Sequence, residues 1–307
     1  MQPNEERELA AAAAAKVRRK VETVFSKLDA YAWLSDRERA EFRHYREVFL
    51  EAVSGIEKRG RDGELRLPRK GKFPDCLPEG PVRLGLYIGS FDPFQMTHIA
   101  AALRLLAYPG TGISQVLVVP EGARNPLKPN RSEYRYRFDI MAKQLRGVFE
   151  PFVCPADLGE DVDTIGIGRR LIAALAGRSL ELDHVVGADV LPFVAHLLPD
   201  DLAWWNAEAA AHSVDFSYRV RAIARIGAPD PTPFIQSIRE RGIAVDYDPR
   251  LIGLPSSTDF RQEGAFTIVF PTAAVIKHLE VIFRYSLDKP WLGGRRRRPA
   301  AEEFRDV

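Results

Sequence analysis

The stretch from Leu84 to Ala102 has the sequence LGLYIGSFDPFQMTHIAAA, which predicts a buried strand, a tight polar turn and the start of a helix. Gly89 follows the apolar run, Ser90 supplies a hydroxyl group, and His98 lies in the first turn of the expected helix. Backbone N–H groups point outward at a helix N-terminus, where the helix dipole favours negative charge. A lone histidine in a helix is commonly structural, but this position favours contact with the phosphates of a nucleotide, and His98 could donate to a phosphate oxygen.

A second hydroxyl-rich segment, LPSSTDFR, begins at Leu254. Its Ser256, Ser257 and Thr258 can cap a helix and also bind an anion. Arg261 lies four residues beyond Ser257, one helical turn further on, and can reach the same anion. Alone, the segment is consistent with a helix cap and a surface arginine; paired with the first stretch, it predicts the other half of one anion site.

The elements that must position these residues alternate between apolar runs and amphipathic segments from Val82 onward. Strands are expected at 84–89, 114–120, near 152–154, 182–189, 221–227 and 242–248, and helices at 99–107, 134–145, 163–177, 232–242, 256–264 and 272–286. Such alternation is typical of βαβ units. It predicts an α/β fold, a Rossmann-like parallel sheet flanked by helices, with ligands at the carboxyl ends of the strands.

Residues 1–80 are expected to form a helical N-terminal extension and linker. Apolar residues recur at helical spacing through about 4–58, and Ser35 is a candidate N-cap of the second helix. Residues 59–81 have the composition of a linker. This helical hairpin would pack on the main domain, 81–287, or on a second subunit. A homo-oligomer is therefore one possible state of the protein. Residues 288–307, with the Arg295–Arg298 cluster, are expected to be a basic, flexible tail.

Composition excludes several classes of protein. The chain has 307 residues, with 44 Lys and Arg against 42 Asp and Glu, so bulk charge gives no case for nucleic acid or an anionic membrane as the main partner. Two cysteines without a CxxC pair exclude a disulfide framework and favour a cytoplasmic location. We expect no signal peptide and no transmembrane helix, because no apolar run approaches about 18 residues.

Together the two motifs resemble the nucleotidyltransferase superfamily, and most closely the bacterial nicotinate-nucleotide adenylyltransferases, over roughly 82–286. That family carries G-[ST]-F-D-P-x-H-x-G-H after its first strand and I-S-S-T-x-[IF]-R near its C-terminus; the corresponding segments here are GSFDPFQMTH and LPSSTDFR. VVGADVL resembles the family's G-x-D segment, and PEGARNPLKP resembles its second-strand loop. Gln95 stands where the family has its first histidine, and Thr97 where it has glycine.

The resemblance implies adenylyl transfer from ATP to nicotinate or nicotinamide mononucleotide, with release of pyrophosphate, in NAD biosynthesis. Two residues would be catalytic, namely His98 and Arg261. The implied ATP-binding residues are Gly89, Ser90, Phe91, Gln95, His98, Gly187, Asp189, Ser256, Ser257, Thr258 and Arg261. The implied acceptor-binding residues are Asp92, Asn125, Lys128, Thr164 and Trp205, with Trp204 as the alternative to the last. Mg²⁺ would bind mainly through the nucleotide phosphates, without a dedicated metal site in the protein.

Several alternatives stay open. With Gln95 and Thr97, the chain is either an active enzyme with a shifted substrate or a slower rate, or a nucleotide-binding protein without efficient transfer. A sister nucleotidyltransferase would act on phosphopantetheine or use CTP on a phosphorylated alcohol. A regulatory or scaffold protein would bind nucleotide without turning it over. A nucleic-acid-binding module rests on the Arg295–Arg298 cluster alone.

Overall fold

The computed structural model describes residues 3–28, 36–68, 71–77, 80–122, 132–225, 227–250 and 269–271. Six strands form one sheet in the order β3-β2-β1-β4-β5-β6, and every neighbouring pair is parallel. They are β1 (Val82–Gly89), β2 (Gln115–Pro120), β3 (Val153–Pro155), β4 (Ser179–Gly187), β5 (Asp215–Ile223) and β6 (Ala244–Asp248). This is the strand order of doubly wound dinucleotide-binding folds, so the expected Rossmann-like class is confirmed.

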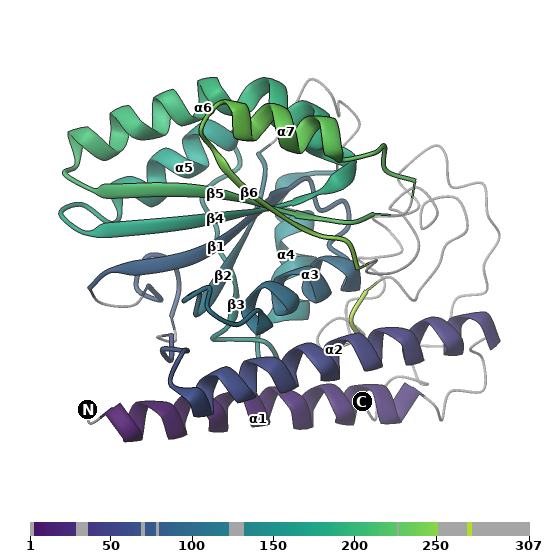
Figure 1. The fold of residues 1–307 in the computed structure, drawn as a ribbon. Coiled ribbons are helices and arrows are strands. Elements are labelled where there is room, and N and C mark those ends of the chain that lie inside the picture. The colour runs from purple at the N-terminus through teal and green to yellow at the C-terminus, as the bar shows by residue number, and fades with distance from the viewer. Residues whose placement is uncertain are drawn as a thin grey trace.

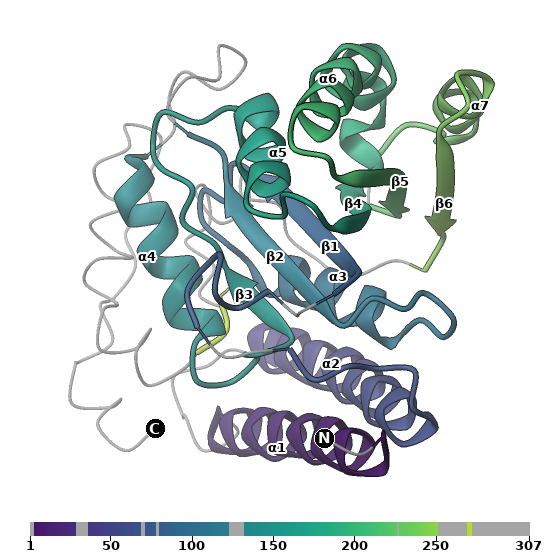
Figure 2. The same ribbon diagram turned by 90° about the vertical axis from the view of Figure 1, so that its left-hand side faces the viewer.

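Helices cover both faces of the sheet (Figure 1). One face carries α3 (Met96–Ala107) and α4 (Tyr134–Leu145), and the other carries α5 (Thr164–Ala173), α6 (Leu191–Ala211) and α7 (Thr232–Glu240). A short 3₁₀ turn, η1 (Ala188–Val190), joins β4 to α6. The N-terminal helices α1 (Pro3–Leu28) and α2 (Asp36–Asp62) form a further layer beyond α3 (Figure 2). No helix in the described part of the chain is long and apolar enough to span a membrane.

The central strand β1 is buried on both sides, which explains its continuous apolar run. Leu84 and Leu86 pack in the cluster beneath α5 and α6, whereas Tyr87 packs in the cluster beneath α3. Gly85 lets α3 approach closely, because a Cβ atom there would lie 2.8 Å from the side chain of Leu105. The sheet therefore holds the end of β1 rigidly, where the predicted phosphate-binding turn begins.

The N-terminal hairpin packs on the α/β domain of the same chain. Helix α1 buries a stripe at helical spacing, consisting of Ala10, Ala14, Val17, Val21, Phe25 and Leu28. Phe49 of α2 makes an edge-to-face contact with Phe149, at 5.7 Å between ring centroids, and Phe25 does so with Phe270 at the same distance. Aromatic pairs of this geometry stabilise beyond their buried area. The hairpin thus packs on the main domain of the same chain, one of the two arrangements that the sequence left open.

Arg59 does not begin a linker, contrary to the prediction for 59–81. Helix α2 continues to Asp62, and the side chain of Arg59 is almost fully buried. Its guanidinium donates to the carbonyl of Leu106 and, at 3.0 Å, to that of Ile113. These carbonyls lie at and just beyond the end of α3. Arg59, which the composition of its segment had placed in a linker, therefore bonds α2 to the α/β domain.

Two other elements differ from the prediction. Helix α6 was not expected, because Pro199 and the pair Asp200–Asp201 interrupt its apolar pattern. Strand β5 begins at Asp215 rather than 221, because its first half is alternately exposed and half-buried and so lacks a continuous apolar run. The expected cap Ser35 and the segments 256–264 and 272–286 lie outside the described residues.

Candidate active site at the end of the first strand

His98 occupies the third position of α3, directly beyond the turn that follows β1. Its Nδ1 atom accepts the backbone N–H of Gln95 at 2.9 Å. Since a neutral imidazole carries one proton, this bond places the proton on Nε2. The ring is 8% exposed and stacks on Phe94 at 5.3 Å between centroids. His98 is therefore a fixed imidazole with Nε2–H as its donor, as a phosphate contact requires.

The turn between β1 and α3 is held in an unusual conformation. Phe91 has a φ of +44°, in the left-handed region that residues with a side chain seldom adopt. Its ring packs edge-on against His98 at 5.0 Å and against Tyr87 at 5.4 Å. Gly89 is needed beside it, because a Cβ atom there would lie 2.9 Å from the Phe91 ring. The glycine expected to admit a ligand thus also admits this aromatic side chain.

Two buried side chains of helix α4 donate hydrogen bonds to the backbone of the same turn. Arg137 is fully buried and donates from Nη1 to the carbonyl of Ser90 at 2.6 Å and from Nη2 to that of Glu121 at 2.8 Å. Gln144, also fully buried, donates from Nε2 to the carbonyl of Phe94 at 2.9 Å. Asp92 accepts the backbone N–H of Ser132 at 3.0 Å, so its carboxylate is engaged in the turn. These bonds fix the ends of β1 and β2 relative to each other.

Gln95 and Thr97 take positions that the sequence did not reveal. Gln95 is the N-cap of α3, and its side chain is 1% exposed. Thr97 lies in the first turn and is itself buried. Its hydroxyl lies 2.6 Å from that of Tyr45 on α2. Thr97 therefore contacts the N-terminal hairpin.

The end of β4 supplies Gly187 and Asp189. A Cβ atom on Gly187 would lie 2.3 Å from the Asp189 carboxylate and 2.7 Å from the Arg225 side chain, so a larger residue would displace these two side chains. Asp189 is exposed and lies 3.6 Å from the guanidinium of Arg225. An ion pair this exposed and long is weak, so Asp189 remains accessible to a ligand.

Glu121 joins two predicted site residues that lie far apart in the sequence. Ser90 donates to its Oε2 atom and Thr164 to its Oε1 atom, each at 3.3 Å. Thr164 is the first residue of α5, and Asp163 caps that helix by accepting the N–H of Gly166 at 2.8 Å. The ends of β1 and β2 and the start of α5 therefore meet around one carboxylate.

Trp205 is fully buried, and its Nε1 donates to the carbonyl of Ile165 at 3.0 Å. A Cβ atom on Gly168 would lie 2.1 Å from its indole ring, so the ring is pressed against the backbone of α5. His184 and Tyr218 pack beside it. This placement contradicts the expectation that Trp205 binds the acceptor. The alternative, Trp204, is 54% exposed.

Six predicted site residues lie outside the described part of the chain. They are Asn125, Lys128, Ser256, Ser257, Thr258 and Arg261. The arrangement above therefore contains the first motif, the G-x-D segment and Thr164, but not the second motif. Within the described ranges no group of three or more His, Cys, Asp or Glu side chains is placed to hold a metal ion.

The sequence did not lead us to predict Arg137 or Glu121 as residues near the site, although a pattern around each of them indicated it. In YRYRFDIM, Arg137 follows Tyr134 by three residues and precedes Met141 by four, which puts a charge on the buried face of the helix. Glu121 directly follows the strand that ends at Pro120. An acidic residue at the carboxyl end of a central parallel strand lies where such sheets bind ligands.

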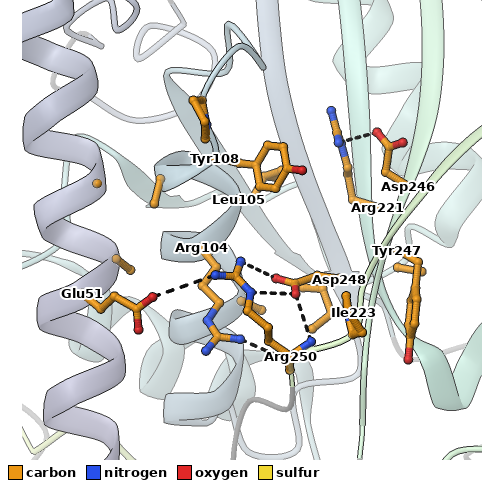
Figure 3. A pocket seen from close by; sticks show the side chains of 17 residues that line it. Glu51, Arg104, Leu105, Tyr108, Arg221, Ile223, Asp246, Tyr247, Asp248 and Arg250 are labelled. Atoms are coloured by element: carbon orange, nitrogen blue, oxygen red, sulfur yellow. Dashed lines mark hydrogen bonds and ion pairs between the residues drawn. The ribbon is translucent and has the colours of Figure 1, made fainter.

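A cavity of about 570 Å³ opens elsewhere, between the helices α2 and α3 and the ends of β5 and β6 (Figure 3). Two ion pairs line it, Arg250 with Asp248 at 2.8 Å and Arg221 with Asp246. Arg104 donates to the backbone carbonyl of Arg250 at 3.1 Å. None of the predicted site residues that the structure describes lines this cavity. It is thus separate from the turn that carries His98.

Comparisons with known proteins give only distant similarity. No model of a known protein family matches the sequence, and no curated protein matches it. Among solved structures, the chain is similar to Plasmodium falciparum nicotinic acid mononucleotide adenylyltransferase complexed with NaAD, at 15% identity and a TM-score of 0.45, over 67% of this chain and 97% of the other. A second structure of that enzyme, complexed with APC, matches at 14% identity and a TM-score of 0.44, over 67% and 96%.

Proposed function

We propose that the chain is a nucleotidyltransferase that moves the adenylyl group of ATP to nicotinate or nicotinamide mononucleotide and releases pyrophosphate. The observation that carries this proposal is the orientation of His98, whose Nδ1 accepts the backbone N–H of Gln95, so that Nε2 carries the ring proton at the N-terminus of α3. Parallel sheets of this strand order bind nucleotides at the carboxyl ends of their strands, where this donor lies. The two motifs, GSFDPFQMTH and LPSSTDFR, supply the resemblance to adenylyltransferases.

In the proposed reaction the protein forms no covalent intermediate with either substrate. The acceptor phosphate is already an anion, so it can attack the α-phosphorus of ATP in line without a general base. Catalysis then consists of holding two anions in line and stabilising charge on the departing pyrophosphate. His98 would donate to that charge through Nε2–H, and the N-terminal amides of α3 would add their dipole. In this proposal Arg261 and the hydroxyls of Ser256 and Ser257 bind the ATP phosphates, and Mg²⁺ enters with the nucleotide.

The buried position of Gln95 favours a second candidate, a protein that binds nucleotide with weak or absent transfer. In that position the side chain offers no contact to the phosphates, whereas the family has a histidine there. Stabilisation of charge during transfer would then depend on His98 and Arg261 without a further histidine. The two candidates agree on the site and differ only in turnover.

A panel assay separates them. Pyrophosphate release would be measured with ATP or CTP against nicotinate mononucleotide, nicotinamide mononucleotide and phosphopantetheine, alongside thermal unfolding with each nucleotide. Turnover with ATP and a pyridine mononucleotide is expected. Turnover with CTP alone, or with phosphopantetheine alone, would replace the proposal by a sister activity. Stabilisation by ATP without any turnover would replace it by nucleotide binding.

A further inference from the structure

The backbone that orients His98 is held by one buried side chain of α4. The peptide unit between Phe94 and Gln95 donates its N–H to Nδ1 of His98 at 2.9 Å. The carbonyl of that same unit accepts from Nε2 of Gln144 at 2.9 Å. Gln144 is fully buried, so this bond is shielded from water. Because a peptide unit is planar and rigid, it connects the position of the Gln144 amide directly to that of the His98 ring.

The amide of Gln144 is itself fixed on both sides. Its Oε1 accepts the backbone N–H of Phe270 at 2.7 Å, and its Nε2 also donates to the carbonyl of Ile140, at 3.4 Å. These partners decide how the amide is turned, because the opposite orientation would set its oxygen against two carbonyls. Phe270 is fully buried, and its ring packs on Phe49 of α2 at 5.7 Å between centroids. The Gln144 amide therefore has one orientation, fixed by packed backbone.

The hydrogen bonds that meet at this peptide unit run in one direction. Phe270 donates to Gln144, and Gln144 donates to the carbonyl of Phe94. The N–H of Gln95 then donates to His98. In a buried series of this kind each bond polarises the next, so the last N–H becomes a stronger donor. A strong donor aimed at Nδ1 favours the imidazole that carries its proton on Nε2.

We infer that Gln144 is a positioning residue, which acts through the peptide unit of Phe94 and Gln95 to hold His98 in one orientation and as its Nε2–H tautomer. Gln144 lies 50 residues from Phe94 in the chain, outside both motifs. Its effect on the reaction rate rests on the proposed function, whereas its effect on the ring proton does not. A donor fixed before the substrates bind needs no reorganisation when charge develops on the departing pyrophosphate.

The test is Gln144→Met, which keeps the length of the side chain and removes both its donor and its acceptor. Heteronuclear NMR of the histidine rings shows which nitrogen carries the proton, and His98→Ala identifies the His98 signals. The unaltered protein should contain the Nε2–H tautomer alone, and Gln144→Met a mixture of both tautomers. Misplacing a catalytic donor should lower kcat by about 10- to 100-fold. KM for either substrate should change by less than about threefold, because the donor is proposed to act on charge that develops during transfer.

Gln115→Met is the matched control. Gln115 is also fully buried, and its Nε2 donates to the carbonyl of Pro151 at 3.1 Å. It begins β2, however, at the other end of that strand from the His98 turn. Gln115→Met should therefore lower stability in urea as Gln144→Met does, but leave kcat and the His98 tautomer unchanged.

Two results with the variants would overturn the inference, namely an unchanged tautomer in folded Gln144→Met or an equal loss of kcat in Gln115→Met. A third needs no variant: a proton on Nδ1 of His98 in the unaltered protein would overturn it even if Gln144→Met does not fold. Absence of turnover in the unaltered protein would overturn the proposed function alone, because the tautomers are measured without substrate.

Discussion

The hydroxyl groups of Tyr45 and Thr97 lie 2.6 Å apart, which joins the N-terminal hairpin to the first turn of α3. Both side chains are buried, so this bond is shielded from water. One residue further along α3 is His98, the donor of the candidate site. The hairpin, which carries none of the predicted site residues, therefore contacts the helix start that the site depends on.

Removing either hydroxyl should destabilise the fold. Either Tyr45→Phe or Thr97→Val removes this hydrogen bond from the remaining hydroxyl. The free energy of unfolding should fall by about 1–2 kcal/mol as a result. The double variant should cost less than the sum of the two, because the second change removes a group already deprived of that bond. Urea unfolding of all four proteins measures the coupling. Tyr108→Phe, at an exposed tyrosine, is the control, and strictly additive losses would refute the coupling.

Arg137→Lys should weaken both the fold and the site. A lysine ammonium cannot bridge the carbonyls of Ser90 and Glu121 as the guanidinium fork does. We expect the free energy of unfolding to fall by about 3 kcal/mol, typical of losing bonds to a buried charged group. Arg135→Lys, on the exposed side of α4, should change it by less than about 0.5 kcal/mol. Equal stability of the two variants in urea would contradict the role given to the two Arg137 hydrogen bonds.

His98→Ala should reduce adenylyl transfer by about 100-fold or more, the usual effect of deleting a donor to developing charge. The measurement is kcat for pyrophosphate release at saturating ATP. Because His98 also packs against Phe91 and Phe94, thermal unfolding must accompany the assay. His196→Ala, at an exposed histidine on α6, is the matched control and should behave as the unaltered protein does. Unchanged ATP binding together with unchanged transfer in His98→Ala would remove this residue from the site.

His184 should make stability fall in mild acid. Burial lowers its pKa from 6.5 to about 4, and its Nδ1 lies 2.7 Å from the Tyr218 hydroxyl. The unfolded chain then binds the extra proton first, so stability contributed by the neutral ring is full above pH 6.5 and is lost as the pH falls towards 4. The loss should approach about 3 kcal/mol.

Urea unfolding of the unaltered protein and of His184→Gln at several pH values between 7 and 4 measures that loss. The glutamine variant should lack this part of the pH dependence. Asp201 acts in the opposite sense, because burial, together with Asp163 and Asp200, raises its pKa to about 6. Both proteins share Asp201, so it cancels in their difference. A difference that stays constant with pH would show that His184 does not titrate in this range.

The strand-turn-helix around His98 was predictable from the sequence because its determinants are local. An apolar run, a glycine, a polar turn and a helical segment follow one another within Leu84–Ala107, and each acts on its immediate neighbours. The alternation of strands and helices likewise predicted the parallel sheet. Helix α6 escaped prediction because Pro199 and two aspartates break its periodic pattern, while burial on the sheet supports the helix in spite of them.

What only the tertiary structure decided is which distant residues meet. Tyr45 and Thr97 are 52 residues apart in the chain, and Arg137 and Ser90 are 47 apart. No local pattern records such pairs, because the packing of helices on the sheet brings them together after each element has formed. Trp205 is buried, and Glu121 lies between Ser90 and Thr164, for the same reason. The sequence by itself thus determined the class of fold and the place of the turn that carries His98, whereas long-range packing determined which charged groups and hydrogen-bond donors lie around it.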